Sequence, residues 1–325
     1  MKLVTSYLQT FEALRRKKRW TTNIMVLRFA ALGLASVELA DPHAQLERIA
    51  SDLRDRAGWF GPLRSEVRYV VAAMLLRRGL SAAQVHPQVV RTRKALRRYR
   101  LPRTAMQTTF AALLLVLHEN GGAVPARNLE RMERIYQCWK QEHFWLTSRD
   151  DLPAAALHAM REESPESLTR RIEEAYAALR RARFRRGNQL QLVSHLMALD
   201  PHGVVKAVQR FERIAHSFRS ERQRILVSHY DEVAILALTE DPPAKLVKRV
   251  LDTCRALRAA RPKPGKELAF SLAAGLVLAE YARRLGEAGS LPALSMLRSV
   301  QAILDAQAAA AMAAVVVVSA ASAAS

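Results

Sequence analysis

Apolar residues recur at spacings of three and four along almost the whole chain, and no segment sustains a strict alternation of apolar and polar positions. A three-to-four spacing places apolar side chains on one face of an α-helix, whereas a half-buried strand needs a period of two. The pattern therefore predicts an all-α protein.

Proline residues mark the starts of the longer predicted helices. A preceding Asp or Ser can accept a hydrogen bond from an N–H group of the first turn. Proline fits the first helical position because the N–H group that it lacks would have no acceptor within the helix. The chain carries such starts at Asp41-Pro42, Val124-Pro125, Ser164-Pro165, Asp200-Pro201, Asp241-Pro242 and Leu291-Pro292. With one more start near Ser81, they recur about every 40 residues.

A shorter and more apolar helix is expected after each long one. Seven segments are too apolar for a surface position, and they cover residues 24–34, 69–76, 110–117, 152–160, 190–199, 233–238 and 268–278. Alternating long amphipathic and short buried helices with this period are typical of an α-solenoid. We expect a right-handed solenoid of about seven helical hairpins over residues 1–305 and an Ala/Ser/Val-rich tail at 306–325. A compact, irregular helical domain is the alternative.

Two blocks of the sequence resemble a known family. Residues 143–153 read HFWLTSRDDLP, and residues 183–195 read RFRRGNQLQLVSH. Both are similar to the corresponding blocks of a bacterial family, found mainly in Bacillota, that is catalogued as domain of unknown function 4003. The resemblance extends over nearly the whole chain. It implies a helical protein in a bacterial cytoplasm, and it implies no catalytic residue.

The charge of the chain is strongly positive, with 51 Lys and Arg against 30 Asp and Glu, a formal net charge of +21. Such a chain attracts anions. Much of the excess stands where long helices are predicted to end, at Arg97, Arg98, Arg100, Arg181, Arg183, Arg185 and Arg186, and again at Arg219, Arg222, Arg224, Arg258, Arg261 and Lys263. One or two cations complement the negative end of a helix dipole. Three or four exceed that need and predict an acidic protein surface, a nucleic-acid backbone or anionic lipid as partner, although a GC-rich genome also produces an arginine bias.

Aromatic residues accompany these basic helix ends. They are Trp20, Trp59, Phe60, Tyr99, Phe144, Trp145, Phe184 and Phe218. Aromatic side chains between arginines can stack on nucleic-acid bases. Because these residues recur at one position of the repeat, packing between hairpins is the favoured interpretation.

A second group of polar residues stands where short helices begin or run, and could line a groove. It comprises Asp150, Asp151, His158, Asn188 and His195. His158 and His195 occupy equivalent places in successive short helices, whereas Asp150, Asp151 and Asn188 are also typical helix caps. No carboxylate or thiolate stands at ligand spacing from the histidines, so neither a metal nor another cofactor is expected. Cys138 and Cys254 are far apart and predict no disulfide framework.

No nucleophile elbow, phosphate-binding loop, dinucleotide-binding turn or HExxH motif occurs in the sequence. We therefore expect a cytosolic, non-enzymatic scaffold that binds another protein through its concave face. RNA or another polyanion bound along the basic edge is the alternative, and an enzyme with a site in the groove is a third hypothesis. The uncharged tail is long enough to span a bilayer, but Ala and Ser insert poorly, so no transmembrane segment is expected.

Overall fold

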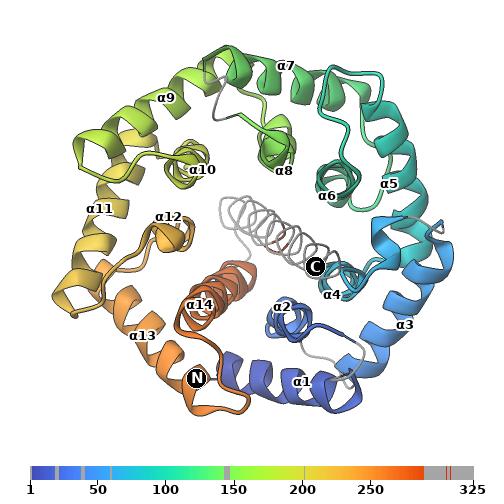
Figure 1. The fold of residues 1–325 in the computed structure, drawn as a ribbon, viewed down its shortest axis with the longest axis horizontal. Helices are drawn as coiled ribbons and strands as arrows, with labels where there is room; N and C mark the ends of the chain where they lie inside the picture. Colours follow the sequence, from blue (N-terminus) through green and yellow to red (C-terminus); the bar gives the residue numbers. More distant parts are fainter. Residues whose placement is uncertain are drawn as a thin grey trace, which may run out of the picture. The chain divides into compact units, whose positions relative to one another are not determined.

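The computed structural model describes residues 2–18, 22–37, 41–58, 61–142, 147–200, 202–288, 305 and 308. These residues contain fourteen α-helices and three short 3₁₀ turns, and no strand occurs among them. The predicted all-α class is thereby confirmed (Figure 1).

The chain divides into two compact units, which are described separately. The N-terminal unit comprises Lys2–Gln137, Thr147–Glu162 and Arg298–Ser325. Its helices are α1 (Lys2–Lys18), α2 (Ile24–Leu34), α3 (Pro42–Arg56), α4 (Arg68–Arg77), α5 (Ala82–Leu96), α6 (Ala105–His118), the larger part of α7 (Ala126–Glu142) and α8 (Leu152–Ala159), with 3₁₀ turns η1 (Pro62–Arg64) and η2 (Arg149–Asp151).

The C-terminal unit contains Cys138–Leu146, with the end of α7, and Glu163–Leu297. Its helices are α9 (Pro165–Arg181), α10 (Asn188–Met197), α11 (Val204–Ser220), α12 (Tyr230–Ala237), α13 (Pro243–Ala259) and α14 (Lys266–Ala288), with the 3₁₀ turn η3 (Val227–His229) before α12.

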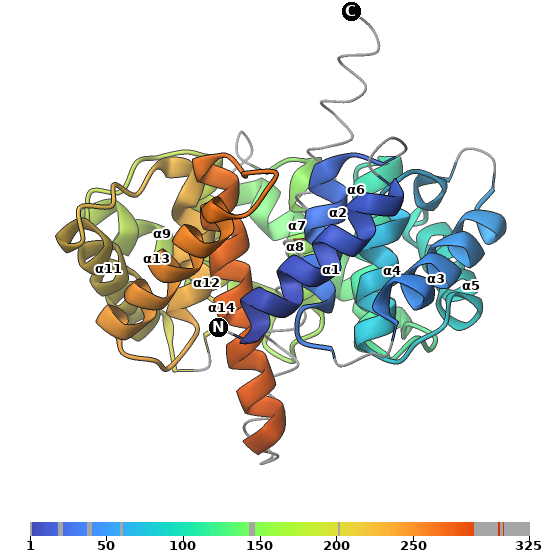
Figure 2. The same ribbon diagram turned by 90° about the horizontal axis from the view of Figure 1, so that it is seen from below.

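Each unit has a layer of long amphipathic helices and a second layer of more apolar helices, which are short apart from α14. In the N-terminal unit α2 packs against α1 and α4, α4 against α3, and α6 against α5 and α8 (Figure 2). In the C-terminal unit α9, α11 and α13 are neighbours in one layer, and α10, α12 and α14 pack on them as the second (Figure 1). The short helices are buried nearly all round, as α4 shows with an unbroken buried run from Tyr69 to Leu75. These helices are apolar because they contact neighbours in their own layer as well as the long helices of the other layer.

Several predicted helix starts match the structure to within one residue, the start at Asp200 is wrong, and Leu291-Pro292 lies outside the described residues. Helix α2 spans the predicted residues, and the Ser81 hydroxyl caps α5 by accepting from Gln84 N at 3.2 Å. The start at Asp200 is wrong, because this carboxylate accepts from His202 N at 2.7 Å in a turn and α11 begins only at Val204. Helix α13 begins at Pro243, one residue after the predicted Pro242, but Asp241 does not cap it.

Partners from other helices explain the role of Asp241. Its Oδ2 atom lies 2.8 Å from Arg249 Nη1 and 2.5 Å from Arg284 Nη2. The Arg284 guanidinium comes from α14, so the carboxylate joins two helices. Although burial alone would raise the pKa of Asp241, these arginines hold it below its ordinary value.

Two of the predicted aromatic residues at the helix ends, Phe184 and Phe218, are core residues. Phe184 packs edge-on against Phe211 with ring centroids 4.8 Å apart, and Phe218 lies 5.3 Å from Phe270. Both Phe184 and Phe218 are buried, as the packing interpretation predicts. Tyr99 is half-buried, and Trp20, Trp59, Phe60, Phe144 and Trp145 lie outside the described residues.

In the part of the chain that the structure describes, no helix combines the length and the apolar character that a membrane span requires. The predicted tail, residues 306–325, lies outside the described residues except for Ala308. The division into a repeat domain at 1–305 and a tail stays a prediction.

Candidate functional site

The ends of α9, α11 and α13 form a basic surface on the C-terminal unit. These three helices run in the same direction, because each is followed by one returning helix, so their C-terminal ends lie at the same end of the unit (Figure 1). We call their cations the exit arginines, although one is a lysine: Arg181, Arg183, Arg185, Arg186, Arg219, Arg222, Arg224, Arg261 and Lys263. All nine are exposed, and none forms an ion pair with another described residue.

Two exit arginines occupy a backbone conformation that favours glycine. Arg183 and Arg222 have φ angles of 65° and 57°. Each stands just after its helix in a Schellman motif: Phe184 N donates to Leu179 O at 3.2 Å, and Gln223 N donates to Phe218 O at 2.9 Å. The motif closes each helix, and after Arg183 the following side chain, Phe184, is buried in the core. Arginine is less favourable than glycine at a positive φ, yet it stands at this position in two successive hairpins. This departure from the local preference indicates that the arginine side chain has a role.

Replacing Arg183 with glycine is expected to raise the free energy of unfolding by about 0.5–1 kcal/mol, because glycine adopts a positive φ without the steric cost of a Cβ atom. Urea unfolding of the variant measures the difference. Arg185→Gly is the control, since Arg185 has no positive φ, and it should lose stability. A loss at Arg183 as large as at Arg185 would show that no strain is stored there.

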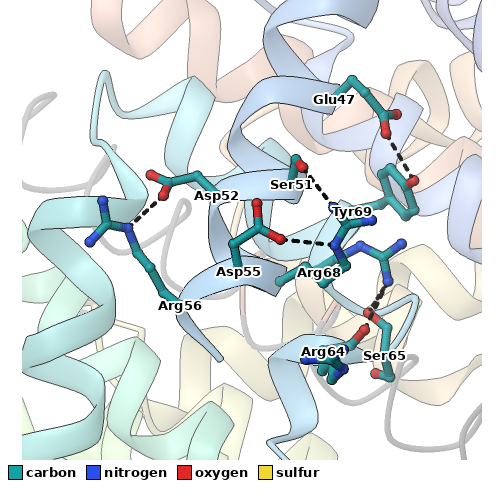
Figure 3. A network of polar contacts seen from close by, with 10 residues as sticks. Glu47, Ser51, Asp52, Asp55, Arg56, Arg64, Ser65, Arg68 and Tyr69 are labelled. Atoms are coloured by element: carbon teal, nitrogen blue, oxygen red, sulfur yellow. Dashed lines mark hydrogen bonds and ion pairs between the residues drawn. The ribbon is translucent and has the colours of Figure 1, made fainter. Parts of the chain in front are cut away.

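The end of α3 in the N-terminal unit provides a contrast, because its arginines are neutralised locally (Figure 3). Arg56 Nε donates to Asp52 Oδ1 at 2.6 Å, and Arg54 Nε donates to Asp55 Oδ1 at 3.1 Å. Nearby, Arg68 donates to backbone carbonyls of the preceding turn. Not every basic helix end in this protein is therefore available to a partner.

The end of α5 carries three more of the predicted cations, Arg97, Arg98 and Arg100, all exposed. The backbone of Arg100 is fixed on α7: its N–H donates to Glu133 Oε1 at 2.6 Å, and its carbonyl accepts from Gln137 Nε2 at 2.5 Å. This turn is thus rigidly placed within the N-terminal unit.

The predicted acidic residues Asp150 and Asp151 lie in η2, immediately before α8. Asp151 accepts from Ser148 N at 2.7 Å, and Ser148 Oγ accepts from Asp150 N at 3.1 Å, which together form a capping box. Asp150 also accepts from Gln107 Nε2 of α6 at 2.8 Å. Burial raises the pKa of Asp151 to about 6, and the neighbouring Asp150 charge adds to this rise.

The two predicted groove histidines fall in different units. His158 on α8 belongs to the N-terminal unit, whereas His195 on α10 belongs to the C-terminal unit, and both are buried. The His195 ring packs on Trp139 with centroids 4.1 Å apart. The capping role expected of Asn188 is wrong, because Gly187 with φ 134° is the N-cap residue and Asn188 is exposed in the first turn.

A second acidic pair, which the sequence analysis missed, lies at the start of α12. The buried Glu232 carboxyl accepts a hydrogen bond from Ser271 Oγ of α14, and Asp231 precedes it in the chain. Burial, followed by the adjacent Asp231 charge, raises the pKa of Glu232 well above its ordinary value. Aligning the hairpins on their short helices would have found this pair, since Asp150 and Asp151 also immediately precede or begin a short helix.

Among the described residues, no three His, Cys, Asp or Glu side chains lie close enough together to bind a metal ion. The strongest chemical feature of the described surface is therefore its group of exposed, unneutralised guanidinium groups.

The fold and this surface define a basic, all-helical protein built from layered long and short helices. The chain belongs to the family described as "Protein of unknown function (DUF4003)", whose model matches residues 10–317, which confirms the resemblance drawn from the two sequence blocks. It is also 25% identical over 315 residues to a protein of Bacillus subtilis (strain 168) described as "Uncharacterized protein YeaA", covering 94% of this chain and 91% of that one. No solved structure matches the chain.

Proposed function

We propose that the protein is a non-enzymatic, cytoplasmic helical-repeat scaffold whose exit arginines bind an acidic surface of another protein. The observation that carries this proposal is the grouping of exposed cations, without ion-pair partners among the described residues, at three neighbouring helix ends. Mutual repulsion between these charges is relieved when a complementary surface binds. In this proposal the hairpins continue as the right-handed solenoid expected from the sequence. Binding through a concave face also stays a prediction.

The chemistry of the surface favours a protein partner over RNA. Arginine forms paired hydrogen bonds with carboxylates as well as with phosphates, so charge alone does not separate the two. Sequence-tolerant binding of single-stranded nucleic acid also uses exposed aromatic side chains on which bases stack. Phe184 and Phe218, the aromatic residues beside these arginines, are buried in the core.

Titrations with two polyanions separate these partner classes. The wild-type protein is titrated with poly-L-glutamate and with poly-uridylate RNA at equal charge concentration and low salt. An exit variant changes four cations to glutamine: Arg181, Arg183, Arg185 and Arg186. A control variant of equal charge changes four exposed cations that lie on α11 and α13 before the C-terminal ends of these helices. They are Lys206, Arg213, Lys245 and Lys248.

Poly-L-glutamate is expected to bind the wild type and the control variant alike, and the exit variant at least about tenfold more weakly. If RNA binds the wild type tenfold more tightly than poly-L-glutamate does, and the exit variant loses RNA affinity to the same extent, the partner is a nucleic acid and not a protein. Equal weakening in both variants would show that only the net charge matters, and the exit site would be abandoned.

A further inference from the structure

A hollow of about 360 Å³ lies at the N-terminal end of α6, within the N-terminal unit. The end of α5, the connection from Leu101 to Thr104 and the first turns of α6 form most of its wall. Its volume falls within the range of about 300–1,000 Å³ that is typical of small-molecule sites. The exit arginines of the C-terminal unit have no part in it.

Three guanidinium groups line this hollow without a counter-charge. Arg93 is half-buried, and Arg97 and Arg103 are exposed. Burial lowers the pKa of Arg93, and the positive charge of Arg97 lowers it further. None of the three forms an ion pair with a described residue; Arg93 Nη1 donates only to Thr109 Oγ1, at 3.3 Å. The nearby Asp150 carboxylate accepts from Gln107 instead. Such a hollow attracts an anion.

Hydroxyl and amide donors stand beside the three arginines. The Oγ1 atoms of Thr104 and Thr108 are buried, and neither has a hydrogen-bond partner among the described residues. Thr104 is the N-cap residue of α6, yet its side chain accepts no hydrogen bond from the first turn. The first-turn amides of this 14-residue helix therefore keep their capacity to bind an anion, which the helix dipole strengthens.

We propose that this hollow binds the phosphate group of a small organic phosphate. Three guanidinium groups, two hydroxyls and a helix N-terminus offer more donors than the two oxygens of a carboxylate can accept, whereas a phosphate monoester presents three terminal oxygens. Leu96, Leu101 and Met132 line the same hollow and provide apolar surface for the organic part of the ligand.

Isothermal titration calorimetry of the full-length chain tests the site with three probes: inorganic phosphate, ribose 5-phosphate and uncharged ribose. The variant Arg93→Gln/Arg103→Gln removes two lining cations. Its control, Arg91→Gln/Lys94→Gln, removes two cations from the same part of the chain that do not line the hollow. A third variant, Thr104→Val/Thr108→Val, removes the two hydroxyls and keeps the side-chain shape.

Ribose 5-phosphate is expected to bind with a dissociation constant below about 1 mM, inorganic phosphate more weakly, and ribose not at all. The arginine variant should bind at least tenfold more weakly and the control within about twofold of the wild type. The threonine variant should also bind more weakly while melting no lower than the wild type, since the hydroxyls that it removes have no hydrogen-bond partners among the described residues. No binding of either phosphate by the wild type, equal weakening by the two charge variants, or unchanged binding by a folded threonine variant would overturn the proposal.

Discussion

Asp305→Ala is expected to lower the free energy of unfolding by about 3–4 kcal/mol, because it leaves two largely buried arginines without their counter-ion. The Asp305 carboxylate is 1% exposed and lies at the C-terminal end of α4. Its Oδ2 atom is 2.8 Å from Arg78 Nη2, and its Oδ1 atom pairs with Arg77 Nη2. Urea unfolding, followed by circular dichroism, measures the loss.

Asp55→Ala is the matched control for this prediction. Asp55 pairs with Arg54 in the same unit, but its side chain is 64% exposed (Figure 3). An exposed pair of this kind contributes less than about 1 kcal/mol. Similar losses in the two variants would contradict the view that burial makes the Asp305 pair important.

Asp151→Asn is expected to stabilise the protein at pH 8 by about 2 kcal/mol and to leave its stability at pH 4 nearly unchanged. Burial raises the pKa of Asp151 to about 6 from an ordinary value of 3.8, so the folded state binds this proton more tightly than the unfolded state. The resulting stability is present below about pH 4 and is lost as the pH rises through about 6. Asparagine is uncharged at every pH and keeps an oxygen that can accept from Ser148 N.

Chemical unfolding at several pH values between 4 and 8 tests this sign. Asp150→Asn is the control, because Asp150 is exposed and should give a much smaller gain at pH 8. A loss of stability at pH 8 in Asp151→Asn would mean that the ionised carboxylate is favoured in the folded protein.

Helix class and helix position could be predicted from the sequence because they depend mainly on local periodicity. Segment 24–34 is apolar nearly throughout, and it became α2 with the predicted ends. The start assigned to Asp200 failed because this residue forms a local turn with His202, whereas the capping role assigned to Asp241 failed for a tertiary reason. Asp241 is held by Arg284, 43 residues away in the sequence, and this pairing removes it from the capping role that its position before a proline indicated.

The candidate site was only partly accessible to sequence reasoning. The arginine clusters are local, so they could be located directly at the ends of predicted helices, and Arg183 and Arg222 are found there. The pairing of Asp305 with Arg77, 228 residues apart, depends on the tertiary fold. The burial of the Thr104 and Thr108 hydroxyls also depends on the tertiary fold, and no local pattern indicates it.

The salt dependence of poly-L-glutamate binding tests the proposed exit site most directly. The affinities of the wild type, the four-residue exit variant and the equally charged control variant are measured over a series of salt concentrations. Contacts between exit arginines and carboxylates release bound counter-ions, so the plot of log affinity against log salt should be shallower for the exit variant and unchanged for the control. Equal slopes for all three proteins would contradict the proposal that the exit arginines form the partner-binding surface.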